Sequence, residues 1–232
     1  LAILKREMQN YFASPIGYIF LAVFYFFAGM FFSSVLYANT TDVTYVFSSL
    51  FTVLIFIIPL LTMRSMSEDK KQKTDQLLLT SPINLSGLVM GKFLAAFLMY
   101  CIALAVTVVY SLILAAFAAP EWSVVIGNIF GALILGAALI AIGVFISSLT
   151  ENQLIAAVGS FAVMMFIMMI DGFASLIPVD FIANIILSLS FMSRYEDFVS
   201  GILNISNVLF FVSIAVVFIF LTVRVLERRR WN

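Results

Sequence analysis

Few side chains in this sequence could carry out chemistry, and their types exclude most catalytic mechanisms. The 232 residues contain no histidine and one cysteine, Cys101, which lies within an apolar run. Catalysis by histidine, a histidine-ligated metal and a disulfide within the chain are therefore excluded. The stretch from Gly87 to Lys92 resembles a phosphate-binding loop, but its glycines are one residue too close together, Phe93 replaces the Ser or Thr, and no predicted strand precedes it. We expect no catalytic residue, no metal ligand and no ATP site in this chain.

A charged, helix-prone segment interrupts the apolar runs between residues 64 and 92. Ser67 is predicted to cap a helix whose first turn holds Glu68 and Asp69, since carboxylates are stabilised at the positive end of a helix dipole. Asp69 and Lys73 stand four residues apart in the order that stabilises a helix. The segment is therefore predicted to form a short polar helix.

This polar helix is predicted to cover residues 65–82, because Pro82 would end it after the apolar run at 77–79. An ordinary solvated loop is the competing interpretation, since runs of charge are often merely solvated. The residues alone favour the loop over the helix.

The sequence around the charged segment is typical of a membrane protein. It is 64% hydrophobic and 10% charged, whereas soluble domains are about 45–50% apolar and about 25% charged. A membrane-spanning helix needs about 17–25 apolar residues. Stretches without ionisable residues that are long enough, or nearly so, lie at 16–37, 47–63, 93–119, 124–149, 154–170 and 203–223. Spans without ionisable side chains disfavour a proton- or ion-coupled carrier.

The distribution of Lys and Arg predicts the orientation of these spans. With six spans and both ends in the cytoplasm, all the Lys and Arg residues except Arg194 lie inside, as the positive-inside rule requires. The inner ones are Lys5, Arg6, Arg64, Lys70, Lys71, Lys73, Lys92, Arg224, Arg228, Arg229 and Arg230. A seventh crossing at 173–193 would move the last four to the outside. This stretch is therefore predicted to be a re-entrant or interfacial hairpin on the outer face, with Asp171, Gly172 and Pro178 as break points.

The first 15 residues have an amphipathic pattern. Leu4, Met8 and Tyr11 fall on one helical face, while Arg6 and Asn10 fall on the opposite face. Such a helix would lie along the inner membrane surface. A cytoplasmic extension of the first span fits the pattern equally well.

Small residues line one face of the predicted span 124–149. Gly127 and Gly131 form a GxxxG pair, and Gly136 continues the same face. Such a face permits close approach of another helix, either within the chain or across a dimer. Asn128 is most simply a packing residue or the donor of an interhelical hydrogen bond.

Four segments together resemble a known family. The run EDKKQKTDQLLLTSPINLSGLVMGKFLAA (residues 68–96) is similar to the signature of ABC-2 type permeases, the membrane subunits of ATP-driven exporters. SSLTENQLIAA (147–157) resembles the loop between the fourth and fifth spans of these permeases, and SFMSRYEDFVSGILNISNVLFF (190–211) resembles their outer segment. The N-terminal LKREMQNYFASPIGYI resembles their interfacial helix. Within the family, the chain looks most like the gliding-motility-associated permeases.

The resemblance implies an all-α membrane protein with six transmembrane helices, an interfacial helix, a cytoplasmic coupling helix and a re-entrant outer hairpin. It implies a single transmembrane domain over residues 1–232. The implied boundaries are 1–15 for the interfacial helix, 16–37, 47–63, 88–119, 124–149, 154–170 and 203–226 for the spans, 65–82 for the coupling helix, 150–153 for a second coupling loop and 171–201 for the outer segment.

The resemblance also implies partners and site residues. A separate cytoplasmic ABC ATPase would bind ATP and Mg²⁺ and drive alternating access in a permease dimer within the bacterial cytoplasmic membrane, with no role for nucleic acid. The second membrane subunit would be another copy, a different permease or an auxiliary protein. The implied ATPase contacts are Glu68, Asp69, Lys73, Thr74, Leu77, Leu78, Thr150, Glu151, Asn152 and Gln153. The segment holding Asp171, Gly172 and Pro178 would act as the outer gate.

Two other functions compete with the ATP-driven exporter. In a stand-alone carrier, the charged segment 64–92 would be passive. In a membrane scaffold, an ATPase partner would drive a mechanical or assembly task without a transported substrate. Association with an ATPase separates the carrier from the other two, and substrate-stimulated ATP hydrolysis separates the exporter from the scaffold.

Overall fold

In the computed structural model, which describes residues 2–71, 84–117, 120–175 and 179–231, every regular element is a helix. The elements are α1 (Ala2–Ala13), α2 (Pro15–Tyr37), α3 (Thr44–Lys71), α5 (Leu85–Phe117), α6 (Trp122–Leu149), α7 (Gln153–Ser175), α8 (Asp180–Ser188), α9 (Phe191–Val199) and α10 (Ile205–Trp231). Within these residues, six helices are long and apolar enough to cross a membrane, namely α2, α3, α5, α6, α7 and α10. The predictions of an all-α membrane protein and of six spans are confirmed.

Local sequence explains several helix boundaries. Pro15 occupies the first turn of α2, where its missing N–H is not needed, and Ser14 before it has extended backbone. The Asp42 carboxylate accepts a hydrogen bond from the backbone N–H of Thr44, at the start of α3. Asn152 accepts one from the N–H of Leu154 in the same way, at the start of α7.

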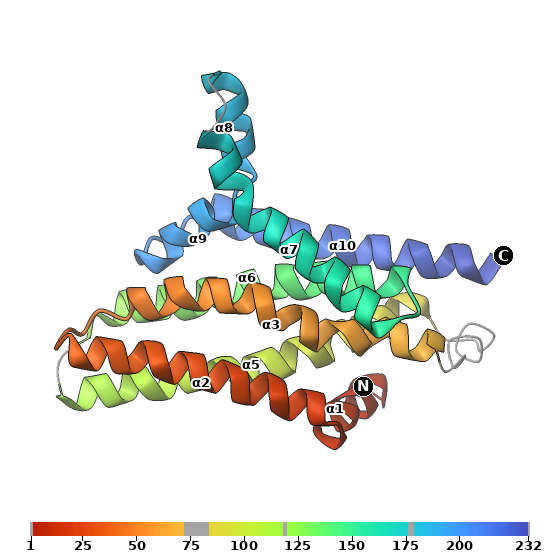
Figure 1. The fold of residues 1–232 in the computed structure, drawn as a ribbon, viewed down its shortest axis with the longest axis horizontal. Coiled ribbons are helices and arrows are strands. Elements are labelled where there is room, and N and C mark those ends of the chain that lie inside the picture. The colour runs from red at the N-terminus through yellow and green to blue at the C-terminus, as the bar shows by residue number, and fades with distance from the viewer. Residues whose placement is uncertain (1, 72–83, 118–119, 176–178, 232) are drawn as a thin grey trace.

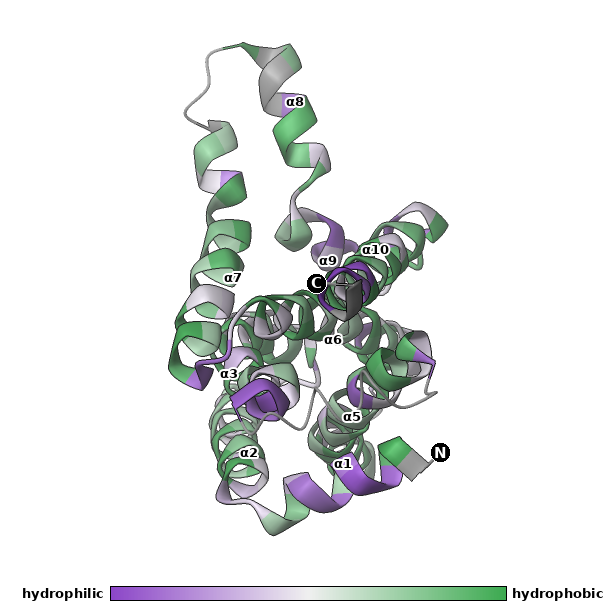
Figure 2. Ribbon diagram, turned by 90° about the vertical axis from the view of Figure 1, so that its right-hand side faces the viewer, coloured by the Kyte–Doolittle hydropathy of each residue, from purple (hydrophilic) through white to green (hydrophobic). Residues whose placement is uncertain are grey.

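The long helices run roughly side by side, and the two ends of this bundle differ in polarity. Figure 1 shows both termini and the link between α6 and α7 at one end, with the links α2–α3 and α5–α6 at the other. Figure 2 looks onto the end with the termini and shows hydrophilic residues on α1, on the end of α3 and on the end of α10. We call this the charged end and, after the orientation that the sequence predicts, the opposite one the outer end.

Helices α3 and α6 form the centre of the bundle and have the most buried apolar segments of the candidate spans. α6 can approach its neighbours closely because its contact face consists of small residues. A Cβ atom added at Gly131 would overlap Phe198 of α9, and one added at Gly136 would overlap Tyr100 of α5. The Tyr100 hydroxyl also donates to the Ala132 carbonyl at 2.8 Å. The glycine face of α6 therefore packs within the chain.

Helix α9 covers α6 at the outer end. The Asn128 amide donates to the carbonyls of Val124 at 2.9 Å and Val199 at 3.1 Å. Gly201 follows α9 with a φ of 78°, a conformation that suits glycine. A Cβ atom at Gly127 would lie 3.3 Å from the Gly201 Cα, so two glycines meet where the end of α9 crosses α6.

Helices α7 and α8 form a hairpin that projects from the bundle (Figure 2). α7 continues to Ser175, so Asp171 and Gly172 lie inside this helix and the chain does not break there as predicted. α7 persists through this pair because one glycine in a helix costs only about 1 kcal/mol relative to alanine. The third expected break point, Pro178, lies outside the described residues.

Candidate functional site

The charged end begins with the last turns of α3, which continue without interruption to Lys71. Ser67 lies inside this helix, and its hydroxyl donates to the Met63 carbonyl one turn earlier. The prediction that Ser67 caps a new helix is therefore wrong, because the helix that begins at Thr44 has not ended there. Glu68 and Asp69 belong to the last turn of the third helix rather than to the first turn of a separate one. The expected contact residues Lys73, Thr74, Leu77 and Leu78 lie outside the described residues.

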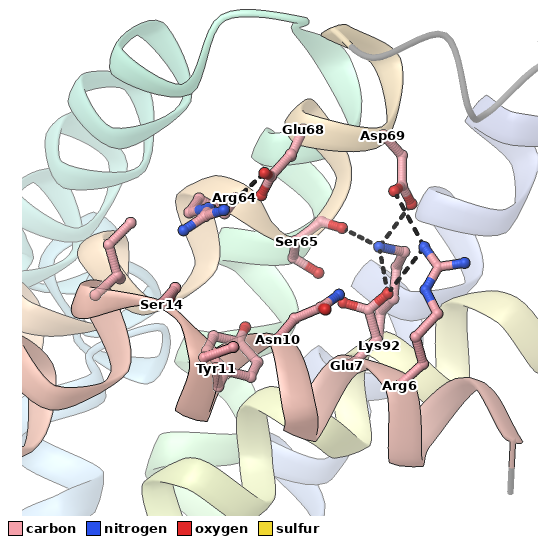
Figure 3. Close-up of a pocket in the computed structure, with 12 residues that line it drawn as sticks. Arg6, Glu7, Asn10, Tyr11, Ser14, Arg64, Ser65, Glu68, Asp69 and Lys92 are labelled. Atoms are coloured by element: carbon pink, nitrogen blue, oxygen red, sulfur yellow. Dashed lines mark hydrogen bonds and ion pairs between the residues drawn. The ribbon is translucent and has the colours of Figure 1, made fainter.

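A lysine near the N-terminal end of the next long helix, α5, is buried in an ionic cluster. Lys92 of α5 is only 3% exposed. Its Nζ lies 2.7 Å from Asp69 Oδ2 and 3.2 Å from Glu7 Oε1, and it donates a hydrogen bond to the Ser65 carbonyl. Arg6 on the surface lies 3.6 Å from Asp69 and 3.8 Å from Glu7 (Figure 3). The two carboxylates therefore share the charges of one buried and one exposed cation.

This cluster joins three helices. Glu7 comes from α1, Asp69 from α3 and Lys92 from α5. A buried ammonium ion is strongly destabilising when its partners are removed, by about 3–5 kcal/mol. These contacts therefore hold the three helices in their relative positions at the charged end.

A tyrosine fixes α1 to α3 at a second point. The Tyr11 hydroxyl donates to the Leu61 carbonyl at 3.1 Å. Burial raises the pKa of this phenol well above its ordinary value, and the nearby Glu7 carboxylate raises it further. Tyr11 therefore stays neutral and keeps its donor at any physiological pH.

Arg64 and Glu68 form a separate pair one turn before the cluster. Arg64 Nε and one terminal nitrogen each lie 2.6 Å from a Glu68 oxygen, so the pair is bidentate. Both side chains are about one quarter exposed, at 27% each. This pair borders a cavity between α1 and α3 that also reaches the ionic cluster (Figure 3).

Two polar contacts hold the end of α3 against the end of α6. The Ser147 hydroxyl oxygen accepts hydrogen bonds from the N–H groups of Met66 and Ser67, both at 3.1 Å, and its hydroxyl donates to the Met63 carbonyl at 3.0 Å. The Lys70 ammonium donates to the Ser148 carbonyl in the last turn of α6. A cation at this place also complements the negative end of the α6 dipole.

The turn between α6 and α7 follows directly and carries the other expected contact residues. Thr150 ends α6 in extended backbone, and its hydroxyl oxygen accepts a hydrogen bond from the Asn152 N–H at 3.2 Å. Glu151 and Asn152 are exposed, while Thr150 and Gln153 are partly buried. The turn thus presents exposed polar side chains at the charged end.

The structure brings together some of the expected residues and separates others. Glu68 and Asp69 share the charged end with Thr150–Gln153, and Lys70 and Ser147 link the two helices that carry them. Asp69 contacts Lys92 and Arg6, so it belongs to the contacts that hold the helices together. The Asp69 carboxylate therefore has a structural role in holding the helices together.

The sequence analysis missed the roles of Glu7 and Lys92. Glu7 lies next to Met8 on the apolar side of α1, between Leu4 and Tyr11, and a carboxylate on that side needs a cationic partner. Lys92 stands at the first turns of an apolar helix. These two signals identify charges that face the bundle, but not which charges meet.

Comparison with known proteins indicates the family of this chain. A family model described as ABC-2 family transporter protein matches residues 56–231, which is more than half of the chain. The match runs from the middle of α3 to α10 and therefore includes the ends of α3 and α6, the turn 150–153 and the α7–α8 hairpin. No curated protein matches the sequence. Within the described ranges, no group of three His, Cys, Asp or Glu residues could hold a metal ion.

Proposed function

This chain belongs to the ABC-2 transporter family, and we propose that it is the permease subunit of an exporter driven by a separate cytoplasmic ATPase. As a member of that family, it is a membrane component of a transporter. The observation that carries the proposal is the joining of α3 to α6 at the charged end. Lys70 and Ser147 fix together the two helix ends from which the segment after Lys71 and the turn 150–153 emerge.

The contacts at the charged end suggest how force would spread through the permease. An ATPase that binds the segment after Lys71 and the turn 150–153 would push on α3 and α6 together, since their ends are joined. The cluster of Glu7, Asp69 and Lys92 would pass the same displacement to α1 and α5. Closure of two ATPase subunits around ATP and Mg²⁺ would then switch the access of the transport pathway from one side of the membrane to the other.

Purification of the tagged protein from its native membrane tests this proposal. We expect an ATP-hydrolysing subunit to co-purify and the complex to hydrolyse ATP. Replacing the exposed contact residues, as in Glu151→Ala with Asn152→Ala, should reduce the recovered hydrolysis about tenfold or more. The matched control is Glu121→Ala, an exposed carboxylate at the outer end. Transport that proceeds without any ATPase would contradict the proposal and favour a stand-alone carrier. Hydrolysis that no substrate class stimulates would favour a scaffold.

We place the charged end in the cytoplasm, so both termini lie inside a bacterial cytoplasmic membrane. Lys and Arg concentrate at this end, and cytoplasmic loops of membrane proteins are enriched in these residues. Cysteines at Asp42, Glu121 and Glu196 should react with an impermeant thiol reagent in whole cells, whereas those at Lys71 and Arg229 should not. Labelling at Arg229 from outside would contradict this orientation.

We further propose that the permease pairs with a second copy of itself, with a different permease or with an auxiliary membrane subunit. The α7–α8 hairpin supports a partner, because it projects from the bundle with exposed side chains such as Phe166, Phe173 and Phe181. A cysteine at Phe181 should cross-link to that partner. The product's mass separates a homodimer from a heterodimer. From the sequence motifs we also propose that the chain belongs to the gliding-motility-associated group of the family.

A further inference from the structure

A cavity of about 310 Å³ lies between α1, the bend from α1 to α2, and the last turns of α3 (Figure 3). This volume is at the lower end of the range for small-molecule sites, about 300–1,000 Å³. Positive and negative side chains line it in equal number, so its formal charge is zero. They are Arg6, Arg64, Lys92, Glu7, Glu68 and Asp69.

One buried polar group in the cavity wall has no partner. Ser65 is 4% exposed, and its hydroxyl makes no hydrogen bond in the part of the chain that the structure describes. In Figure 3 the hydroxyl points into the space between α3 and α1. A buried polar group left unsatisfied costs about 1–3 kcal/mol, so a ligand that bonds to it recovers that free energy.

Two further groups beside Ser65 favour an anionic atom. Arg64 uses Nε and one terminal nitrogen for Glu68, and its other terminal nitrogen makes no hydrogen bond among the described residues. The 23-residue helix α2 begins at the cavity wall, where Ser14 makes no side-chain capping bond. The positive end of an uncapped helix attracts phosphate.

The cavity also adjoins an apolar surface. Ala13, Ser14 and Ile16 form its wall at the bend. Phe12 and Tyr18 on either side of the bend are 42% and 58% exposed, and their rings meet edge to face at 6.5 Å. Aromatic side chains of this kind sit at the level of lipid headgroups. A polar ligand that also carries acyl chains therefore fits this position.

We propose that the cavity binds the headgroup of a phospholipid of the ethanolamine type. Its phosphate bonds to Arg64, the Ser65 hydroxyl and the positive end of α2, and its ammonium group donates to the carboxylates of Glu68 and Glu7. Its acyl chains lie against the exposed face formed by Phe12, Tyr18 and Ile19. A zwitterionic headgroup matches the zero formal charge of the wall, whereas an anionic one adds an uncompensated negative charge. This proposal does not depend on the ATPase partner, since the site lies within the permease.

Native mass spectrometry of the purified permease, with added lipids, tests the proposal. Phosphatidylethanolamine should be retained about tenfold better than phosphatidylglycerol, since the anionic lipid has no ammonium group and adds an uncompensated negative charge to the wall. Phosphatidylcholine should bind more weakly too, because its quaternary ammonium has no N–H to donate. Equal retention of the three lipids, or retention of none, would overturn the proposal.

Two variants separate the site from general lipid adhesion. Arg64→Gln with Glu68→Gln removes the charges of both partners together, and it should weaken phosphatidylethanolamine binding about tenfold. The matched control, Arg224→Gln with Glu227→Gln, removes the exposed pair on α10 and should leave binding unchanged. Ser65→Ala should weaken lipid binding several-fold while leaving the lipid-free protein as stable as before. Equal lipid binding by all these variants would overturn the assignment of the headgroup to this cavity.

Soluble phosphate compounds distinguish a lipid from a free phosphate source. Phosphoethanolamine and inorganic phosphate should raise the melting temperature much less than the intact lipid, because they lack the acyl chains. A soluble phosphate that binds as tightly as the lipid would overturn the assignment to a lipid.

Discussion

The charged end and the α7–α8 hairpin are held in opposite ways. At the charged end, contacts join residues far apart in the sequence, such as Lys92 with Glu7, 85 residues apart, and Ser147 with Ser67, 80 residues apart. In the hairpin, α7 packs on α3 and α6, but α8 depends on nearer contacts. α8 packs against α7, and Arg194 donates to the Ser188 carbonyl, only six residues away.

This difference matters for a protein that must move. Displacing one helix at the charged end displaces its neighbours, because their ions and hydrogen bonds would otherwise be left unpaired in a buried place. Helix α8 packs mainly on α7, whereas α7 itself packs on α3 and α6. We therefore expect the helices at the charged end to move together, and α8 to be the element least constrained by the bundle.

The largest expected effect comes from Lys92→Met at the charged end. The change removes the buried cation that contacts both Glu7 and Asp69, so it should lower the free energy of unfolding by about 3–5 kcal/mol. Unfolding in mixed detergent micelles measures this. Adding Glu7→Gln and Asp69→Asn should restore most of the loss. No recovery in the triple variant would show that the charges are not the cause.

The second effect concerns the close packing of α3 on α6. A Cβ atom added at Gly143 would overlap the Thr62 side chain. Gly143→Ala should therefore cost about 1–3 kcal/mol, and Thr62→Ala in the same protein should recover part of it. In the hairpin, a Cβ atom at Gly172 meets nothing within 4 Å, so Gly172→Ala should be neutral or stabilising. Equal destabilisation at both sites would contradict the contrast between the close packing at Gly143 and the open space at Gly172.

Arg194→Gln should loosen the hairpin and leave the bundle intact. The guanidinium donates to the Ser188 carbonyl and to the Asn207 side chain at 3.0 Å, and it lies 4.3 Å from the Phe210 ring centre. Its loss should speed hydrogen exchange in α8 and α9, while global stability falls by only about 1 kcal/mol. Faster exchange in α1 or α5 would mean that the two regions are not independent.

The smallest effect is expected for the exposed pair on α10. Arg224 and Glu227 lie 2.7 Å apart with side chains 60% and 40% exposed. Arg224→Gln should change stability by about 0–0.5 kcal/mol, since water screens such pairs. A loss comparable with that of Lys92→Met would show that burial does not decide the strength of ion pairs here.

The sequence predicted the spans better than the contacts between them. Long apolar runs and the distribution of Lys and Arg were sufficient to predict six spans, because the thickness of the bilayer sets the length of a spanning helix. The glycines of α6 marked a close-packed face, but only the fold could show that Phe198, Gly201 and Tyr100 fill it.

The charged end was harder to predict because its pairing depends on tertiary structure. Asp69 and Lys73 matched a local helix pattern, yet Asp69 contacts Lys92 of the next helix. Ser67 matched a helix cap, yet it lies inside α3. Local rules describe an isolated helix, and here the neighbours α1, α5 and α6 decide which partner each polar group finds.

Cross-linking from the turn 150–153 tests most directly the claim that an ATPase acts on the charged end. Cys101→Ala provides a background without thiols, into which Glu151→Cys and, as the outer-end control, Glu121→Cys are introduced separately. A cleavable thiol cross-linker applied to the purified complex should join the Glu151→Cys protein to the ATP-hydrolysing subunit and block hydrolysis until the link is cleaved. The Glu121→Cys protein should give neither effect. A complex that hydrolyses ATP but links to its ATPase from position 121 rather than from position 151 would contradict the account.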